Sequence, residues 1–241
     1  MCVFVFIELA THTNVNLRSK FLNLCGDASN TNPASLTGEA VDNECASEVN
    51  QMDSKVALLT VDFCCMVLGF VYEDWQVVKQ NLPTVEKYRA EAEGYFTTGF
   101  MYTWIAACHY DIYYMDGIGK HKRQGRRAHR KVNMWATTGT DWLVGPNSFL
   151  RAMESLCVKR ARVDQVEILF EEAAVACASG QLRFFEALSN ERLARLFLRE
   201  KLNTTKGIRY LRRAIELYRS WGAVAKAEWL EKRYGDDVPS L

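Results

Sequence analysis

The stretch that decides the fold runs from Val163 to Tyr234 and reads VDQVEILFEEAAVACASGQLRFFEALSNERLARLFLREKLNTTKGIRYLRRAIELYRSWGAVAKAEWLEKRY. Apolar side chains recur in it every three or four residues in three successive segments, which SGQ and NTTKG separate. This spacing places the apolar side chains of each segment on one face of a helix. A single helix cannot remove such a face from water, so the pattern predicts helices that stack against one another.

An apolar pattern at offsets 0, 4 and 7 occurs four times along the chain. Its members are Val78, Leu82 and Val85; Ala128, Val132 and Trp135; Val166, Phe170 and Ala173; and Gly207, Leu211 and Ala214. In the last two sets the order is small, large, small, which is the signature of the second helix of a tetratricopeptide-type unit. These two sets lie 41 residues apart, more than the ~34 residues of a regular unit, so the repeats are expected to be irregular. The alternative is a globular bundle of ordinary amphipathic helices.

The composition is typical of a folded, all-helical protein. Of the 241 residues, 49% are hydrophobic and 24% are charged, as in ordinary globular domains. The chain holds four prolines and no alternating strand pattern with Asn-Gly turns, which predicts an all-α fold. The net charge of +1 argues against nucleic acid and against an anionic membrane as the partner. No apolar run approaches the ~18 residues of a membrane span, so no membrane association is expected.

Neither the cysteines nor the histidines form a recognisable site. The eight cysteines include no CxxC pair, and most lie in apolar helical stretches, where a thiol behaves as a small hydrophobic group. Free thiols indicate a reducing compartment, which predicts a cytoplasmic protein. The four histidines show no HExxH or paired-ligand spacing, so no metal ligand is predicted.

The pattern divides the chain into three regions. Residues 1–54 are rich in small polar side chains without a helical period, and are predicted to form a disordered tail. Residues 55–235 are predicted to form an irregular tetratricopeptide-like α-solenoid of about four helical hairpins. Residues 236–241 are predicted to be a flexible tail. Within the body, one long aromatic helix is expected over Glu86–Tyr114, and Pro83 is expected to kink the preceding helix or to start a new one.

The sharpest charge feature is the basic run KHKRQGRRAHRK. Its seven basic residues are Lys120, Lys122, Arg123, Arg126, Arg127, Arg130 and Lys131. Such a run is typical of sites that bind phosphate groups or nucleic acid. However, the apolar seam that begins at Ala128 lies in the same segment, so the run is also explained as the solvated face of a repeat helix.

No constellation for catalysis can be assembled from the sequence. The GxxxxGK[ST] loop of ATP-binding proteins is missing, as are the HRD and DFG motifs of kinases and the GxSxG motif of hydrolases. Cys108 and His109 are adjacent, but neighbouring residues on a helix point about 100° apart and cannot form a dyad. The chain is therefore predicted to have no catalytic, cofactor-binding or metal-binding residues.

Two segments near the C-terminus carry a resemblance to a known family. They are residues 187–200, ALSNERLARLFLRE, and residues 210–234, which end in the pattern W-G-A-x-A-K-x-x-x-L-E-x-x-Y. The pattern falls on Trp221, Gly222, Ala223, Ala225, Lys226, Leu230, Glu231 and Tyr234. These segments resemble the tetratricopeptide-like region of large STAND/AAA-type signalling ATPases, whose chains join a protein-kinase-like domain and an ATPase to GAF, histidine kinase or cyclase domains. Residues 126–136 and 73–78 are similar to further parts of that region.

The resemblance covers about residues 55–234 and includes neither the ATPase nor an output domain. It implies a non-catalytic protein-interaction module, a scaffold or sensor segment of a signalling ATPase or kinase system. Its partner would be a protein, such as an ATPase, a kinase or another signalling protein. The alternative function is nucleic-acid or phosphate binding through the basic helix 120–131. The sequence carries no signal of oligomeric state.

The end of the body has a predicted structural role. Trp221 is expected to be a buried packing residue, and Gly222 to be the left-handed C-cap of its helix. Residues 223–234 are then expected to form a covering helix, with Ala225, Trp229 and Leu230 against the array, because a terminal repeat has an uncovered face.

Overall fold

The computed structural model describes residues 55–92, 97–158, 160–200 and 202–235. Within these ranges all regular structure is helical and no strand occurs, which confirms the all-α prediction. The α-helices are α4 (Lys55–Val71), α5 (Trp75–Tyr88), α6 (Thr98–Asp116), α7 (Gly119–Thr137), α8 (Val144–Leu156), α9 (Val163–Ser179), α10 (Arg183–Arg199), α11 (Thr204–Trp221) and α12 (Val224–Tyr234). Short 3-10 helices cover Arg89–Ala92 and Asp141–Leu143. The predicted tails, 1–54 and 236–241, lie outside the described residues.

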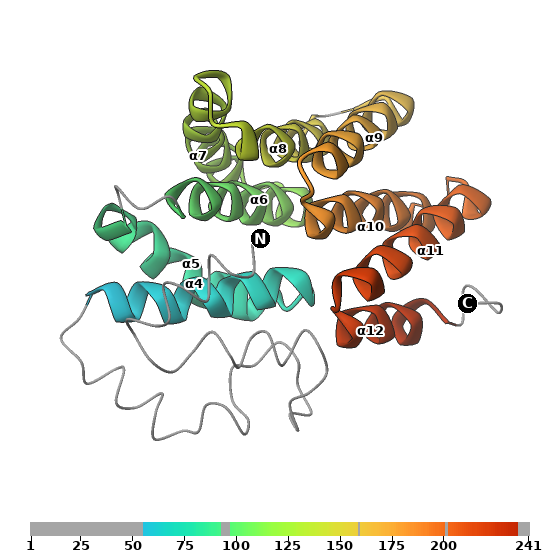
Figure 1. Cartoon of the computed structure of the whole chain (residues 1–241), viewed down its shortest axis with the longest axis horizontal. Helices are drawn as coiled ribbons and strands as arrows, with labels where there is room; N and C mark the ends of the chain where they lie inside the picture. Colours follow the sequence, from blue (N-terminus) through green and yellow to red (C-terminus); the bar gives the residue numbers. More distant parts are fainter. Residues whose placement is uncertain (1–54, 93–96, 159, 201, 236–241) are drawn as a thin grey trace.

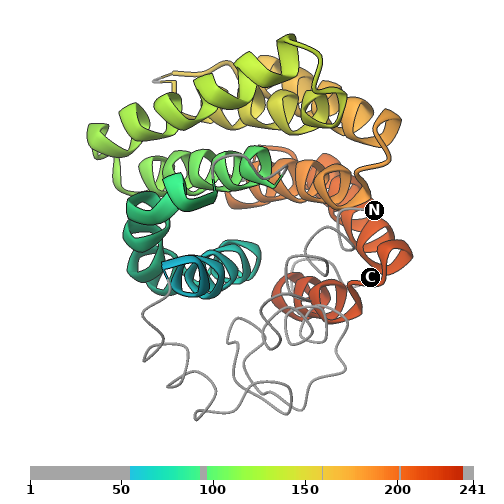
Figure 2. The same cartoon turned by 60° about the vertical axis from the view of Figure 1, so that its left-hand side comes forward.

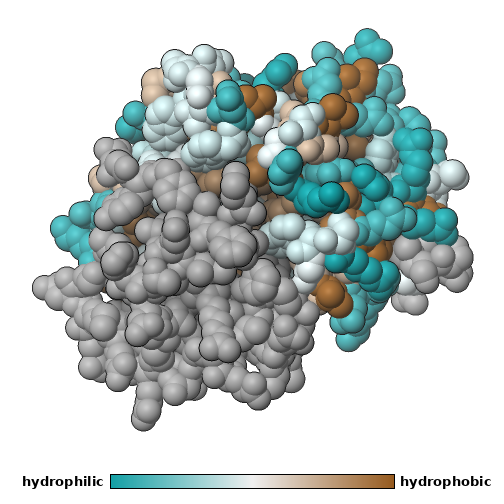
Figure 3. All heavy atoms as spheres, in the orientation of Figure 1, coloured by the Kyte–Doolittle hydropathy of each residue, from teal (hydrophilic) through white to brown (hydrophobic). Residues whose placement is uncertain are grey.

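Consecutive helices pack as pairs: α4 with α5, α6 with α7, α8 with α9, and α10 with α11, while α12 packs on α11. The pairs follow one another along an arc, with α6 and α10 in its middle row (Figures 1 and 2). The pattern at offsets 0, 4 and 7 falls on α5, α7, α9 and α11, the second helix of each pair. Its residues are buried except for Trp135, which is partly buried. On the face seen in Figure 3, hydrophilic side chains dominate where α11 lies, in keeping with its amphipathic pattern.

A glycine lies at the contact within each helix pair. A Cβ added to any of the four would approach an atom of the partner helix to 3.1 Å or less. The four are Gly69, Gly125, Gly145 and Gly207. At Gly125 the added atom would lie 2.9 Å from the Tyr110 ring of α6. The missing side chains allow each pair of helices to pack closely.

The prediction of one long helix over Glu86–Tyr114 is wrong. α5 ends at Tyr88, the 3-10 helix Arg89–Ala92 follows, and α6 begins only at Thr98. The sequence of this junction holds no proline to stop a helix, which is why its periodicity looked continuous. Pro83 does not start a new helix, because α5 runs through it with the proline on the exposed side.

The two central helices are buried on nearly every side. All residues of 98–112 in α6 and of 185–197 in α10 are buried. They include charged side chains: Asp111 in α6, and Glu186, Glu191, Arg192 and Arg195 in α10. Buried charges are costly unless they are paired, so their partners fix how the surrounding helices sit.

Glu73, in the turn between α4 and α5, pairs with arginines of α10 and α12. Its carboxylate lies 2.7 Å from Arg199 and 2.8 Å from Arg233 through one oxygen, and 3.5 Å from Arg195 through the other. Arg195 also pairs with Asp111, which fixes α6 in the same cluster. Glu73 has a backbone φ of 58°, a left-handed conformation that is unfavourable for a residue with a Cβ. The strained backbone of this turn thus lies where the ion pairs of Glu73 and Arg195 join α5, α6, α10 and α12.

Arg192 completes the cluster. Its side chain is 1% exposed, its Nη2 lies 2.9 Å from Asp111, and its guanidinium stacks 4.4 Å from the centre of the Phe70 ring. Neither the Asp111 contact nor any other within the described residues has hydrogen-bond alignment, so Arg192 is held by charge and by the ring face.

Lys226 of α12 occupies a second buried site next to this cluster. Its ammonium donates to the backbone carbonyl of Val71 at 2.6 Å and to Glu191 at 2.8 Å. The Trp229 ring centre lies 3.9 Å away, and the Tyr72 ring 5.6 Å away. Burial lowers the pKa of Lys226, while Glu191 opposes this shift. The last helix is therefore joined to the end of the first described helix by a lysine that no solvent reaches.

We expect Gly125→Ala to lower the free energy of unfolding by about 1–2 kcal/mol, although alanine favours helices, because the new methyl group meets the buried Tyr110 ring. Gly119→Ala is the matched control in the same helix, since its Cβ would meet nothing closer than Arg123 at 3.8 Å. Urea unfolding compares the two. A loss in Gly119→Ala as large as in Gly125→Ala would refute the close-packing role.

Because the ion pairs of Glu73 require its ionised carboxylate, we expect the free energy of unfolding to fall in acid. Although burial raises its pKa, the four arginines lower the pKa from 4.5 to about 2. The folded-state pKa lies below the unfolded one, so this contribution is complete above pH 4.5 and is lost as the pH falls toward 2. We expect Glu73→Gln to cost about 3 kcal/mol at pH 7 and the difference from wild type to shrink below pH 4.5. Urea unfolding across pH tests this, with the exposed Glu172→Gln as control; a difference independent of pH would contradict it.

Candidate functional site

A basic groove lies between α7 and α8. Its cavity has a volume of about 620 Å³. Four arginines face it with two neutral polar residues and one acid, namely Arg123, Arg126, Arg130 and Arg151, His129 and Asn133, and Glu154. A pocket of this size and charge is suited to an anionic ligand or segment.

The seven predicted basic residues all lie on α7, which carries no acidic residue, but they do not form one patch. Arg123, Arg126 and Arg130 face the groove with α8. Arg127 and Lys131 line a different cavity on the other side of α7. The remaining two, Lys120 and Lys122, lie near the start of the helix, where the Lys122 ammonium donates to the Cys157 carbonyl at 2.5 Å.

Glu154 of α8 links the groove to the core. Its Oε1 accepts from Arg126 at 2.6 Å. Its Oε2 lies 3.2 Å from the Tyr110 hydroxyl and 3.4 Å from His129 Nδ1. Burial raises the pKa of Glu154, but the hydrogen bond and charge of Arg126 outweigh it and lower the pKa overall. The groove's one acid is therefore ionised and already partnered.

A chain of hydrogen bonds runs through His129 in the wall of the groove. Its Nε2 lies 3.1 Å from Asn147 Oδ1, and Asn147 in turn donates to Asn133 at 3.1 Å. The Tyr110 hydroxyl lies 3.1 Å from His129 Nδ1. Burial lowers the pKa of His129, although Glu154 opposes the shift, so the ring is neutral at pH 7 and donates from Nε2 to Asn147. This network fixes one wall of the groove without using the outer arginines.

Three guanidinium groups in the groove are free to bind. Arg123, Arg130 and Arg151 have no ion-pair partner in the part of the chain that the structure describes. Arg126 differs from them, because its charge is already compensated by Glu154. Guanidinium groups match carboxylate and phosphate oxygens in two-pronged hydrogen bonds, so the three free groups are suited to a bound anion.

Near the groove lies one buried thiol, Cys157. Among the described residues, no three His, Cys, Asp or Glu side chains are grouped so as to hold a metal ion. The nearby Cys157 thiol is buried, and burial raises its pKa to about 12, which disfavours the thiolate that a nucleophile requires.

Sequence reasoning found the arginines of α7 but missed the other half of the groove. Arg151 and Glu154 lie in α8, and nothing in the sequence shows that α8 packs beside α7. His129 did carry a signal, because it lies next to Ala128 in the predicted apolar seam, where an ionisable side chain is buried.

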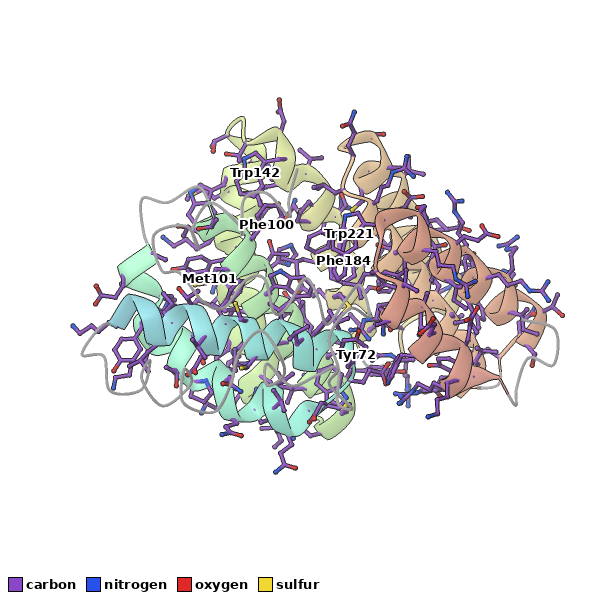
Figure 4. All side chains as sticks on the ribbon, turned by 60° about the horizontal axis from the view of Figure 1, so that its bottom comes forward. Tyr72, Phe100, Met101, Trp142, Phe184 and Trp221 are labelled. Carbon is purple, nitrogen blue, oxygen red and sulfur yellow. The ribbon has the colours of Figure 1, made fainter. Side chains whose placement is uncertain are left out.

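The C-terminal signature is a packing motif. Gly222 is the left-handed C-cap, with φ 93°, as predicted. Leu230 and Tyr234 are buried, and so is Lys226, whereas Ala225 and Trp229 are only partly buried. Trp221 is also partly rather than fully buried; its ring packs 5.0 Å from that of Phe184 (Figure 4). Leu230 and Trp229 pack against the array as expected, with the Trp229 ring 5.7 Å from that of Tyr72, whereas Ala225 does not belong to the core and the buried face includes Lys226.

Comparison with known proteins gave no match to a protein family, to a curated protein or to a solved structure. In the described ranges, none of the helices has the length and apolar character needed to cross a membrane.

We expect Lys226→Ala to destabilise the chain by about 3–5 kcal/mol, because Glu191 stays buried without its counter-ion. Trp221→Ala should cost less than the Lys226 change, since its ring is partly exposed. The double variant Lys226→Met/Glu191→Gln removes both charges and should recover much of the loss. Urea unfolding ranks the three, and a larger cost for Trp221→Ala than for Lys226→Ala would contradict the arrangement.

Proposed function

We propose that this chain is a non-catalytic helical-repeat interaction module that binds an acidic segment of a partner protein in the groove between α7 and α8. The observation that carries the proposal is that Arg123, Arg130 and Arg151 face one cavity without an ion-pair partner among the described residues. Such groups gain most from a partner that supplies several carboxylates in sequence.

Two features support a repeat architecture of the tetratricopeptide-like kind. The buried pattern at offsets 0, 4 and 7 recurs in the second helix of every pair, and each pair packs at a glycine. Arrays of this kind present extended surfaces to protein segments. The resemblance of residues 187–200 and 210–234 to signalling ATPases favours a scaffold or sensor segment, with a component of such a system as the partner.

An acidic protein segment fits the groove better than nucleic acid does. Proteins that bind single strands combine basic tracks with aromatic side chains on which bases stack, and no aromatic ring of that kind lines this groove.

The proposal predicts that a fluorescein-labelled Glu-rich peptide binds the chain and that Arg123→Glu/Arg130→Glu weakens binding by about tenfold or more, because two attractive charges become repulsive. Fluorescence anisotropy measures the affinity. The control, Arg127→Glu/Lys131→Glu, makes the same charge change on the other side of α7 and should alter it by no more than about twofold.

A labelled single-stranded oligonucleotide and a Lys-rich peptide are titrated in parallel. Tighter binding of the oligonucleotide, lost in the Arg123→Glu/Arg130→Glu variant and steeply dependent on salt, would favour nucleic-acid binding through the basic helix instead. Equal losses in both double variants would show nonspecific attraction and overturn the assignment of the groove.

A further inference from the structure

A second groove lies on the opposite side of α7, where α5 and the 3-10 helix after it form the other wall and α6 forms the floor. Its volume is about 550 Å³, within the range of small-molecule sites. Apolar residues contribute to its lining: the buried Tyr102 and Ile105 form the floor, and the exposed Pro83 and Ala90 and the buried Ala128 belong to the walls. The residues that line the groove with α8 are all polar or charged, so the two grooves present different residue types although they share a helix.

The rim of this second groove is basic. Lys87 and Arg89 come from one wall, and Arg127 and Lys131 from α7. Arg89 is turned back to the carbonyl of Glu86, and the Lys87 ammonium lies 4.8 Å from the centre of the Tyr88 ring. Arg127 and Lys131 have no ion-pair partner within the described residues and are four residues apart, so they repel each other across the rim.

The groove's one carboxylate does not neutralise these cations. Glu86 Oε1 lies 3.1 Å from Nε2 of the buried His109, whose Nδ1 is 3.0 Å from Nδ1 of His121. Glu86 is thus tied to α6 and α7 below the groove, and Arg127 and Lys131 remain free above it.

We propose that this second groove binds a small amphipathic organic anion. The apolar body of the ligand lies against Pro83 and Ala90, the exposed apolar residues of the wall, and its carboxylate, sulfonate or phosphate group bridges Arg127 and Lys131. The bridging anion removes the repulsion between the two cations, while the apolar lining provides affinity that an inorganic anion cannot gain.

Titration with 1-anilinonaphthalene-8-sulfonate, an aromatic body with one sulfonate, tests the site by its fluorescence. We expect saturable binding to the full chain, weakened about tenfold by Arg127→Glu/Lys131→Glu and unchanged by Arg123→Glu/Arg130→Glu. Ala90→Glu, which places an acid on the exposed apolar wall, should also weaken it. Circular dichroism confirms that each variant keeps its helical fold.

Competition identifies the body of the ligand. Displacement of the probe by laurate indicates an aliphatic body, and displacement by adenosine monophosphate indicates an aromatic one; either supports the proposal. Displacement by inorganic phosphate at the same concentration as the organic anions would reduce the site to a simple anion site and overturn it. Binding that does not saturate, or that both double variants weaken equally, would overturn it as well.

Discussion

The pairing of one carboxylate with arginines from two distant helices is the constraint on which this structure depends. Glu73 lies in the short connection between α4 and α5, yet its partners come from α10 and α12, more than 100 residues later. Removing charges from water is costly, and only good geometry and several partners offset that cost. The cluster therefore tolerates one arrangement of the helices far better than any other. Apolar packing makes the arc stable, whereas these ion pairs determine where its two ends meet.

α7 is unusual in this protein because most of its positive charges have no acidic partner among the described residues. Elsewhere in the described ranges, buried cations such as Arg195 and Lys226 meet carboxylates from other helices. α7 has seven cations and no acid of its own, and only Arg126 among the groove-facing arginines has a carboxylate partner there. Folding alone does not require this excess, because Ala128 and Val132 already anchor the helix in the core. The uncompensated charge is the basis of both proposed binding sites, one on each side of the helix.

Features that arise between residues close together in the sequence were predictable, and those that join distant residues were not. Helix faces were predictable because they arise from neighbours three and four residues apart, and so was the cap at Gly222. The burial of Arg192 was not predictable, since Asp111, which pairs with it, is 81 positions earlier on another helix. For Lys226 the sequence and the structure each supply a part. The resemblance marks it as one position of a pattern, but only its contacts with Val71 and Glu191 explain why a lysine is buried there. The sequence indicated only the α7 wall of the groove, because Arg151 and Glu154 come from α8, outside the basic run.

The contacts of α12 also bear on the order in which the chain matures. Lys226 meets the Val71 carbonyl across 155 positions, and Arg233 meets Glu73 across 160. A ribosome releases the chain from its N-terminal end, so the earlier pairs can assemble while α12 is still unmade. During that interval Glu191 lacks Lys226 and Glu73 lacks Arg233. Closure of the arc by α12 is thus a late, long-range step, because its contacts with Val71 and Glu73 cannot form until residues 226 and 233 have been made.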